Sequence, residues 1–434
     1  MEIKHVLKNG AWIIICKCVQ MILSLLVTML TARYLGPGNY GILNYAISIT
    51  SFVSPIALLG INSVMVQEII SHKDEEGKIV GTSLLMSVIS SLLCIIGVLL
   101  FVSIANRGER DTFIVCGLYS IMLIFQSLEM IQYWYQAKLL SKYTSLTMMF
   151  AYFVVSGYKI LLLIKGASIY SFALSYALDY FITSSVLIFL YQKKGTQKLR
   201  FSKKIGKRII SKSKYYIIST LMVTLFAQQD KVMLKIMIGN EATGIYSAAV
   251  TCATMSGFIF VAIIDSVRPL IYENKLINQK KYETSIINLY SIIIYLSILQ
   301  GIVCTVFAKQ IITIIYGNDY AQSIEVLQII IWYSAFSYIG GIRDVWLLAE
   351  NKQRYLLIIN SCGALGNLVL NYILITVLGI NGAAWASLLT QAFTNVGITF
   401  FLKPIRRNNY FVFTAVNPKY ALQMAKRLTN IFSK

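Results

Sequence analysis

The chain has 434 residues, of which 57% are hydrophobic and 13% are charged, and its mean hydropathy is +0.68. Soluble domains contain about 45–50% apolar and about 25% charged residues, so this composition excludes a soluble enzyme and a disordered chain. Twelve membrane spans of about 20 residues would use roughly 240 positions, which agrees with the apolar content. The net charge of +21 can be interpreted only from the positions of the basic residues along the chain.

Hydropathy predicts an all-α membrane protein with about twelve transmembrane helices. The weakest boundary is the one between the fifth and sixth spans, because only Lys165 and Gly166 separate them. An even number of spans places both termini on one side of the membrane. In chain order, the predicted spans are 10–33, 40–62, 79–105, 112–136, 144–164, 167–190, 215–238, 244–267, 286–307, 323–349, 355–376 and 382–402.

The basic residues of the connections predict the orientation. The side that carries both termini holds 29 Lys and Arg residues, and the other side holds five. Because cytoplasmic loops are enriched in Lys and Arg, both termini are expected in the cytoplasm. This placement explains the net charge without any nucleic-acid partner.

The connection 191–214 contains ten basic residues and no acidic one. We interpret it as a loop that sets the topology and rests on anionic headgroups, at about 1 kcal/mol per basic residue; capture of a phosphorylated lipid is the alternative. It divides the chain into an N-terminal six-helix lobe at 1–190 and a C-terminal six-helix lobe at 215–402. A basic cytoplasmic tail follows at 403–434, and we interpret it as a helix on the membrane surface.

The two predicted lobes resemble each other. Gly36-x4-Gly41-Ile42 joins spans 1 and 2, and Gly239-x4-Gly244-Ile245 joins spans 7 and 8. A second pair, Trp134-x8-Tyr143 and Trp346-x8-Tyr355, follows spans 4 and 10. Six helices per lobe give both lobes the same orientation, so the pattern predicts a parallel repeat with substrate near the midplane. The glycines are expected to supply positive φ in short turns.

Cysteine and histidine usage gives no sign of a metal centre or cofactor. All seven cysteines lie in or beside apolar segments, none has CxxC spacing, and the chain has two histidines, His5 and His72. We interpret the cysteines as small hydrophobic residues.

Several segments are similar to the Wzx-type polysaccharide-biosynthesis flippases of the multidrug/oligosaccharidyl-lipid/polysaccharide exporter superfamily. One departure is Gln67-Glu68 after span 2, where relatives often have Arg. The similar segments are Thr31–Gly41 (TARYLGPGNYG), Gln229–Leu234 (QDKVML) with Gly244–Ala249 (GIYSAA), and Asn371–Leu374 (NYIL) with Leu378–Ala384 (LGINGAA).

The resemblance implies a MATE-like fold of two six-helix lobes in a V, related by pseudo-twofold symmetry. It implies a flippase that moves undecaprenyl-pyrophosphate-linked oligosaccharide repeat units across the bacterial inner membrane for O-antigen or capsule assembly, rather than an enzyme. Its partners would be this lipid-linked oligosaccharide, membrane lipids, a polysaccharide polymerase and a chain-length regulator.

Ionisable residues inside spans are the functional candidates, because each costs about 2.5–3.5 kcal/mol at a helix centre. A cavity lined with cations would bind the pyrophosphate through charge-assisted hydrogen bonds. The candidate substrate-binding cations are Lys17, Lys159, Lys231, Lys235 and Arg343. Alternatively, Lys17 extends to the interface, Arg343 and Asp344 point apart near the cytoplasm, and Asp230 neutralises Lys231 and Lys235 in a structural network.

Coupling to H⁺ or Na⁺ would require a carboxylate within a span. Asp179 is the first candidate because it is the most isolated, Glu129 is the second, and Asp230 is the third. A Na⁺- or H⁺-coupled multidrug efflux pump of the same superfamily is the alternative function, and a scaffold for polymer assembly is a third. The sequence contains no nucleotide-binding GxxxxGK[ST] motif.

Overall fold

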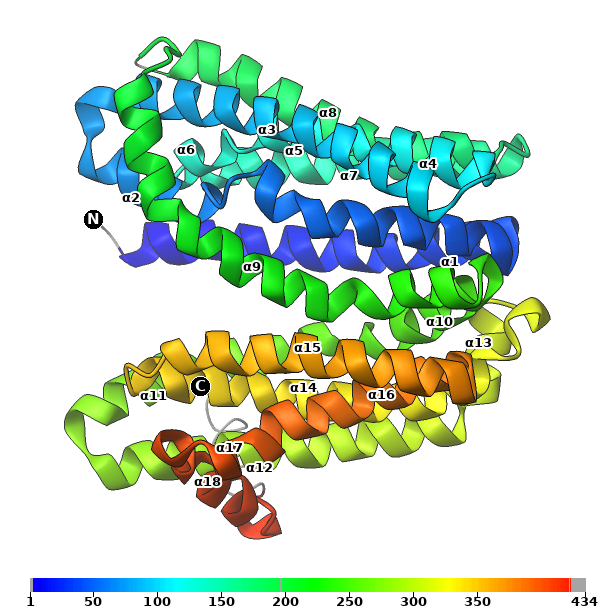
Figure 1. The fold of residues 1–434 in the computed structure, drawn as a ribbon. Helices are drawn as coiled ribbons and strands as arrows, with labels where there is room; N and C mark the ends of the chain where they lie inside the picture. The colour runs from blue at the N-terminus through cyan, green and yellow to red at the C-terminus, as the bar shows by residue number, and fades with distance from the viewer. Residues whose placement is uncertain (1–2, 196, 421, 423–434) are drawn as a thin grey trace. The chain divides into compact units, whose positions relative to one another are not determined.

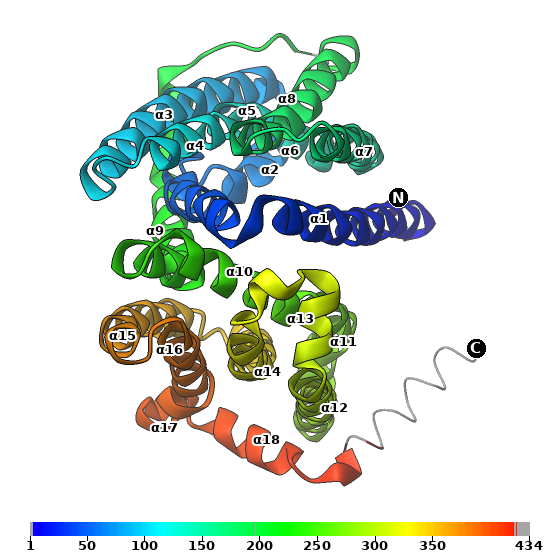
Figure 2. The ribbon, with the colours of Figure 1, turned by 90° about the vertical axis from the view of Figure 1, so that its right-hand side faces the viewer.

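The fold is known from a computed structural model that describes residues 3–195, 197–420 and 422. Within these residues, the side chains of 3–19, 21 and 22 are not described. The described residues form helices joined by short turns and contain no β-strand, as the all-α prediction requires. Figures 1 and 2 show the course of the helices from two directions.

The helices of the first half are α1 (Ile3–Ala57), α2 (Asn62–Ser71), the 3-10 turn η1 (Lys73–Glu75), α3 (Glu76–Ala105), α4 (Arg110–Ser120), α5 (Met122–Glu129), α6 (Gln132–Ala137), α7 (Ser141–Ile164), α8 (Ile169–Lys194) and α9 (Lys203–Met237). Those of the second half are α10 (Asn240–Thr254), α11 (Gly257–Ile277), α12 (Gln279–Val306), α13 (Ala308–Ile315), η2 (Asn318–Tyr320), α14 (Ser323–Ala349), α15 (Arg354–Leu378), α16 (Ile380–Ala392), a π-helical turn (Phe393–Gly397), α17 (Ile398–Phe401), η4 (Lys403–Ile405) and α18 (Arg407–Ala415).

Each of the twelve predicted spans corresponds to described helices. The first two spans are the two arms of α1, which changes direction at Gly36 with φ 69°. The fourth span is the run α4–α6, the eighth is α10 with α11, and the last is α16 with α17. Among the described residues, eight helices or helix runs are long and apolar enough to cross a membrane: Lys73–Ala105, Arg110–Ala137, Ser141–Ile164, Ile169–Lys194, Asn240–Ile277, Gln279–Val306, Ser323–Ala349 and Arg354–Leu378.

The chain packs as two compact units, Met1–Ile236 and Met237–Lys434. This division falls at the end of α9, whereas the sequence places the boundary in the connection 191–214. Helix α9 belongs to the first unit because both of its ends are held there by ion pairs, as described below. The assignment of the seventh span to a C-terminal lobe stays a prediction.

The predicted repeat is visible in the backbone of the turns. Gly36 and Gly239 both have positive φ, at 69° and 132°, as the glycine argument predicts. The turns after the two repeated tryptophans also match, because Leu139 and Asn351 have φ of 58° and 55°. Two further pairs occupy equivalent turns: Gly108 with Gly317, and Gly166 with Gly379.

Each unit has its own apolar core, and a repeated tryptophan fills each one. Trp134 packs edge-on against Tyr135 and Tyr191, with ring centroids 4.9 and 4.8 Å apart. Trp346 packs edge-on against Phe411 of α18 at 6.0 Å. The part of the predicted tail that the structure describes therefore includes a helix that packs on its own unit, whereas residues 423–434 lie outside the described residues.

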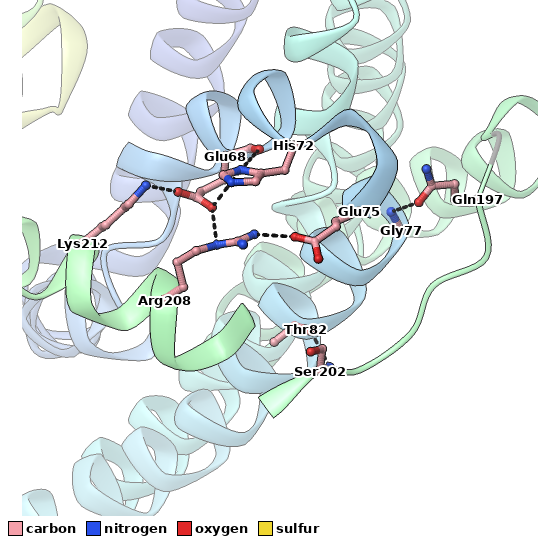
Figure 3. A network of polar contacts seen from close by, with 9 residues as sticks. All are labelled: Glu68, His72, Glu75, Gly77, Thr82, Gln197, Ser202, Arg208 and Lys212. Atoms are coloured by element: carbon pink, nitrogen blue, oxygen red, sulfur yellow. Dashed lines mark hydrogen bonds and ion pairs between the residues drawn. The ribbon is translucent and has the colours of Figure 1, made fainter. Parts of the chain in front are cut away.

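The basic connection is docked on the turn between α2 and α3 (Figure 3). The buried carboxylate of Glu68 accepts hydrogen bonds from Arg208 Nε at 2.9 Å and Lys212 Nζ at 2.5 Å. Arg208 Nη2 also donates to Glu75 at 3.0 Å. Part of the charge that the sequence assigns to lipid headgroups is therefore used within the protein.

The backbone of the connection lies directly against α3. Gly77 N–H donates to Gln197 Oε1 at 3.0 Å, and Ser202 N–H donates to Thr82 Oγ1 at 2.9 Å (Figure 3). A Cβ at Gly77 would lie 2.5 Å from Lys198 O, and one at Gly81 would lie 2.7 Å from Arg200 N. These glycines allow the close approach that fixes the connection on the first unit.

Candidate functional site

The helix is interrupted in two predicted spans of the first unit, near the end of the second span and within the fourth. The second span is interrupted between α1 and α2, where Leu59 and Gly60 have φ of 52° and 57°. The fourth span is interrupted between α5 and α6, at Met130 and Ile131. At both breaks the backbone continues through tighter i→i−3 hydrogen bonds, such as Ile61 N–H to Leu58 O at 3.0 Å and Ile131 N–H to Leu128 O at 3.3 Å. Irregular backbone within a span is tolerated where it lines a cavity.

A cavity of about 370 Å³ lies at these two breaks. Its volume falls in the range of small-molecule sites, about 300–1,000 Å³, and it is larger than the cage of oxygen ligands around a bare ion. Most of the lining side chains carry a carboxylate, an amide or a hydroxyl. They are Gln20, Leu58, Asn62, Gln126, Glu129, Met130, Gln132, Tyr133, Met148, Asp179, Tyr180 and Thr183.

The structure brings together two of the three predicted ion-coupling residues. Glu129 at the end of α5 is buried, and Asp179 of α8 lines the same cavity. The two carboxylates interact electrostatically with each other, and Asp179 also interacts with Lys159 of α7. The described lining of the cavity therefore contains two carboxylates and no Lys or Arg.

Lys159 of α7 packs against an aromatic side chain. Its ammonium group lies 3.8 Å from the centre of the Tyr176 ring, in a cation–π contact. Lys159 is also attracted electrostatically to Asp179 of the cavity wall.

Two more predicted cations lie near the other end of α9. The buried ammonium of Lys235 donates to Glu109 Oε2 in the turn between α3 and α4, and Thr112 Oγ1 donates to the same oxygen at 2.6 Å. Burial raises the pKa of Glu109, but the hydrogen bonds from Lys235 and Thr112 outweigh burial and hold that pKa below its ordinary value. Sequence reasoning missed Glu109 because it lies in a connection 126 residues away from Lys235.

Lys231 and Asp230, one turn earlier on α9, are close to each other. Lys231 Nζ donates to Gln228 at 3.2 Å and interacts electrostatically with Asp230, which is buried. This agrees with the structural alternative considered for that pair. Lys17 lies on α1, but its side chain is outside the described residues.

Arg343 of α14 is buried in the second unit, and its guanidinium is occupied by protein groups. Its Nε and Nη2 donate to Asp344 Oδ1 at 3.0 and 2.6 Å, so the adjacent side chains meet rather than point apart. Its Nη1 donates to Thr394 O at 2.8 Å and Asn395 Oδ1 at 2.9 Å. Both acceptors lie in the π-helical turn, where the changed hydrogen-bond pattern leaves a carbonyl available.

No group of three His, Cys, Asp or Glu residues in the described part of the chain is arranged to hold a metal ion. The described cysteines are unpaired thiols.

Comparisons with solved structures identify the fold. The chain is similar to an inward-facing multidrug resistance MATE family transporter of the MOP superfamily, with 16% identity, a TM-score of 0.66, and coverage of 90% of this chain and 95% of that chain. It is also similar to the lipid II flippase MurJ in an inward closed conformation, with 14% identity, a TM-score of 0.75, and coverage of 93% and 90%. A MOP superfamily transporter from Pyrococcus furiosus has 14% identity, a TM-score of 0.58, and coverage of 94% and 96%.

Comparison with sequence families identifies the chain itself. No curated protein sequence matches it. A family described as polysaccharide biosynthesis protein matches residues 6–275, which is more than half of the chain. With its many apolar helices and its MATE-like fold, this multi-pass membrane protein therefore belongs to the polysaccharide biosynthesis protein family.

Proposed function

We propose that the protein is a flippase for lipid-linked oligosaccharide repeat units, carried on undecaprenyl pyrophosphate, in the inner membrane of a bacterium. Its product would be used for a surface polysaccharide such as O-antigen or capsule. Family membership and a fold shared with transporters support this proposal. The distribution of 29 basic residues against five supports an orientation with both termini in the cytoplasm.

The observation that carries the proposal is the polar cavity at the two broken spans of the first unit. Sugars present many hydroxyl groups, which amide and carboxylate side chains bind as donors and acceptors. Asn62, Gln126 and Gln132 supply amides, while Glu129 and Asp179 supply carboxylates. We assign this cavity to a sugar of the repeat unit, because its acidic wall would repel a pyrophosphate.

The pyrophosphate requires cations, and Lys17, Lys159, Lys231, Lys235 and Arg343 remain the proposed ligands. Lys235 and Arg343 are already paired with carboxylates, Glu109 and Asp344. Phosphate and carboxylate oxygens accept the same charge-assisted hydrogen bonds, so a pyrophosphate would replace Glu109 or Asp344 as the partner. In this proposal, exchange of partners accompanies the alternation of access.

Ion coupling is a separate part of the proposal. Glu129 and Asp179 are near each other in a partly enclosed cavity, and Asp230 is buried on α9. We propose that H⁺ or Na⁺ binds at these carboxylates when the sugar has left the cavity, which would link ion release to substrate loading.

The test is complementation of a deletion strain. Deletion of the gene should abolish the surface polysaccharide, and the wild-type gene should restore it. Glu129→Gln and Asp179→Asn together should lower surface polysaccharide at least about tenfold, since two charge-assisted hydrogen bonds are lost. The variant Lys203→Gln/Lys204→Gln, which changes two exposed lysines that do not line the cavity, serves as the control. The amount of protein in the membrane is measured for every variant.

A multidrug efflux pump is the second candidate function, because the acidic cavity would also accept an organic cation. For such a pump, deletion would leave the surface polysaccharide intact and lower tolerance to cationic dyes. That outcome would overturn the flippase proposal.

A further inference from the structure

A second cavity lies in the other unit, at the turn between α11 and α12. It has a volume of about 530 Å³, and none of its lining residues is acidic. The lining residues come from the last two turns of α11 and the first two turns of α12. They are Leu270, Asn274, Asn278, Lys280, Lys281, Thr284 and Ser285.

The polar wall of this cavity is held in place by its own hydrogen bonds. Asn278 Oδ1 accepts from Lys281 N–H at 3.1 Å and begins α12. Asn274 Nδ2 donates to Ser285 Oγ at 2.9 Å, which ties the two helices together. Thr284 Oγ1 donates to Lys280 O at 2.8 Å. These bonds hold the wall without using the ammonium groups of Lys280 and Lys281, both of which are exposed.

Lys280 and Lys281 have no acidic partner in the part of the chain that the structure describes. The third lysine of this turn, Lys275, forms an ion pair with Glu350 at 2.9 Å, so its charge is already compensated. The neighbouring Glu283 is bound by Arg407 at 2.5 Å. The cavity therefore has two uncompensated positive charges, which favour an anionic ligand.

Apolar side chains surround the same turn. Leu276 and Ile277, the last described side chains of α11 before the turn, are 88% and 66% exposed, and Leu270 in the cavity wall is 44% exposed. Exposed apolar residues next to lysines are typical of the zone between headgroups and acyl chains. Inorganic phosphate would contact only the lysines, whereas a lipid would contact the lysines through its headgroup and the exposed apolar side chains through its acyl chains.

We propose that the turn between α11 and α12 binds an acidic phospholipid. The phosphate of its headgroup accepts hydrogen bonds from Lys280 and Lys281, and its acyl chains lie over Leu276 and Ile277. This site is separate from the proposed transport site, and all of its residues belong to the second unit. It would hold an annular lipid at the predicted cytoplasmic surface.

The experiment counts lipids that stay bound to the purified full-length protein in native mass spectrometry. The detergent-solubilised protein is titrated with phosphatidylglycerol and, separately, with zwitterionic phosphatidylethanolamine. Three proteins are compared: wild type, Lys280→Gln/Lys281→Gln, and the control Lys203→Gln/Lys204→Gln. The control removes another exposed Lys-Lys pair, at the start of α9, which does not line this cavity.

We expect the affinity of the tightest phosphatidylglycerol site to fall about tenfold or more in Lys280→Gln/Lys281→Gln and less than about twofold in the control. Wild type should prefer phosphatidylglycerol to phosphatidylethanolamine. Equal losses in both variants would overturn the proposal, because they would indicate attraction by net charge alone. Displacement of the lipid by millimolar inorganic phosphate would also overturn it and identify a free-phosphate site. Surface polysaccharide is measured separately, so failure of the flippase proposal leaves this result interpretable.

Discussion

The turn after the second predicted span and the turn after the eighth occupy equivalent places in the repeat, but their charges are opposite. The first carries buried Glu68 and Glu76, whose carboxylates are paired with Arg208, Lys212 and Lys138. The second carries three lysines, of which Lys275 alone has an acidic partner. The first turn thus binds the basic connection 191–214 of the same chain. In the second turn, Lys280 and Lys281 form no ion pair among the described residues.

This difference separates two uses of charge that look the same in the sequence. A buried carboxylate with several cationic partners is structural, because removal of the carboxylate leaves those cations without compensation. An exposed lysine pair contributes little to stability, and its charge is available for a ligand. Substitutions at the two turns should therefore have very different effects.

The largest effect is expected for Glu68→Ala. It removes the acceptor of both Arg208 and Lys212 and should destabilise the first unit by about 2–3 kcal/mol. The value is below that for a fully buried pair because the Arg208 and Lys212 side chains remain 28% and 48% exposed. Thermal unfolding in detergent measures the loss, with exposed Asp74→Asn as the control. An apparent Tm equal to that of the control would mean that the docked connection is not held by Glu68.

The sequence predicted much of this fold and only part of the site. Twelve apolar segments and the repeated glycines predicted the spans and the turns, because both depend on residues close together in the chain. The sequence predicted Asp179 and Glu129 as separate candidates, but not that they line the same cavity. The breaks at Leu59 and Met130 were not predicted, because the first lies near the end of the predicted second span and the second lies within the fourth span with no glycine or proline beside it.

Long-range partners were the main omission. Glu109 for Lys235, and Glu68 for Arg208, lie more than a hundred residues away from the cations that they bind. A charge in a sequence has no visible partner until the helices are packed, so paired and open cations cannot be distinguished by position alone. The sequence predicts that the basic connection sets the topology and rests on anionic headgroups, but it gives no sign that two of its cations, Arg208 and Lys212, are bound to Glu68.

An intermediate effect is expected for Glu350→Gln at the second turn. Lys275 Nζ and Tyr282 Oη both donate to Glu350 Oε1 at 2.9 Å, and the variant should cost about 1 kcal/mol at pH 7 for these partly exposed groups. Burial raises the pKa of Glu350, but these hydrogen bonds outweigh burial and lower that pKa below its ordinary value of 4.5. The stabilisation is therefore complete above about pH 4.5 and is lost as the pH falls through the lower pKa of the folded state.

The apparent Tm of wild type and Glu350→Gln, measured from pH 7 to pH 3, checks this sign. The difference between the two proteins should be largest near pH 7 and should shrink in the acid range. The variant Glu273→Gln changes an exposed carboxylate on the same helix as Lys275 and should show no such trend. A difference that grows as the pH falls would contradict the argument.

The smallest effect on stability is expected for Lys280→Gln/Lys281→Gln, and its small size is the informative result. Neither ammonium has an acidic partner among the described residues, and the hydrogen bonds of the cavity wall use the backbone of these lysines rather than their ammonium groups. The free energy of unfolding in lipid-free detergent should therefore change by less than about 0.5 kcal/mol. When phosphatidylglycerol is added, wild type should gain apparent Tm, and the variant should gain less, because a ligand stabilises only the state that binds it. A large loss already without lipid would show that the two lysines are structural, as Arg208 and Lys212 are, and the contrast between the two turns would disappear.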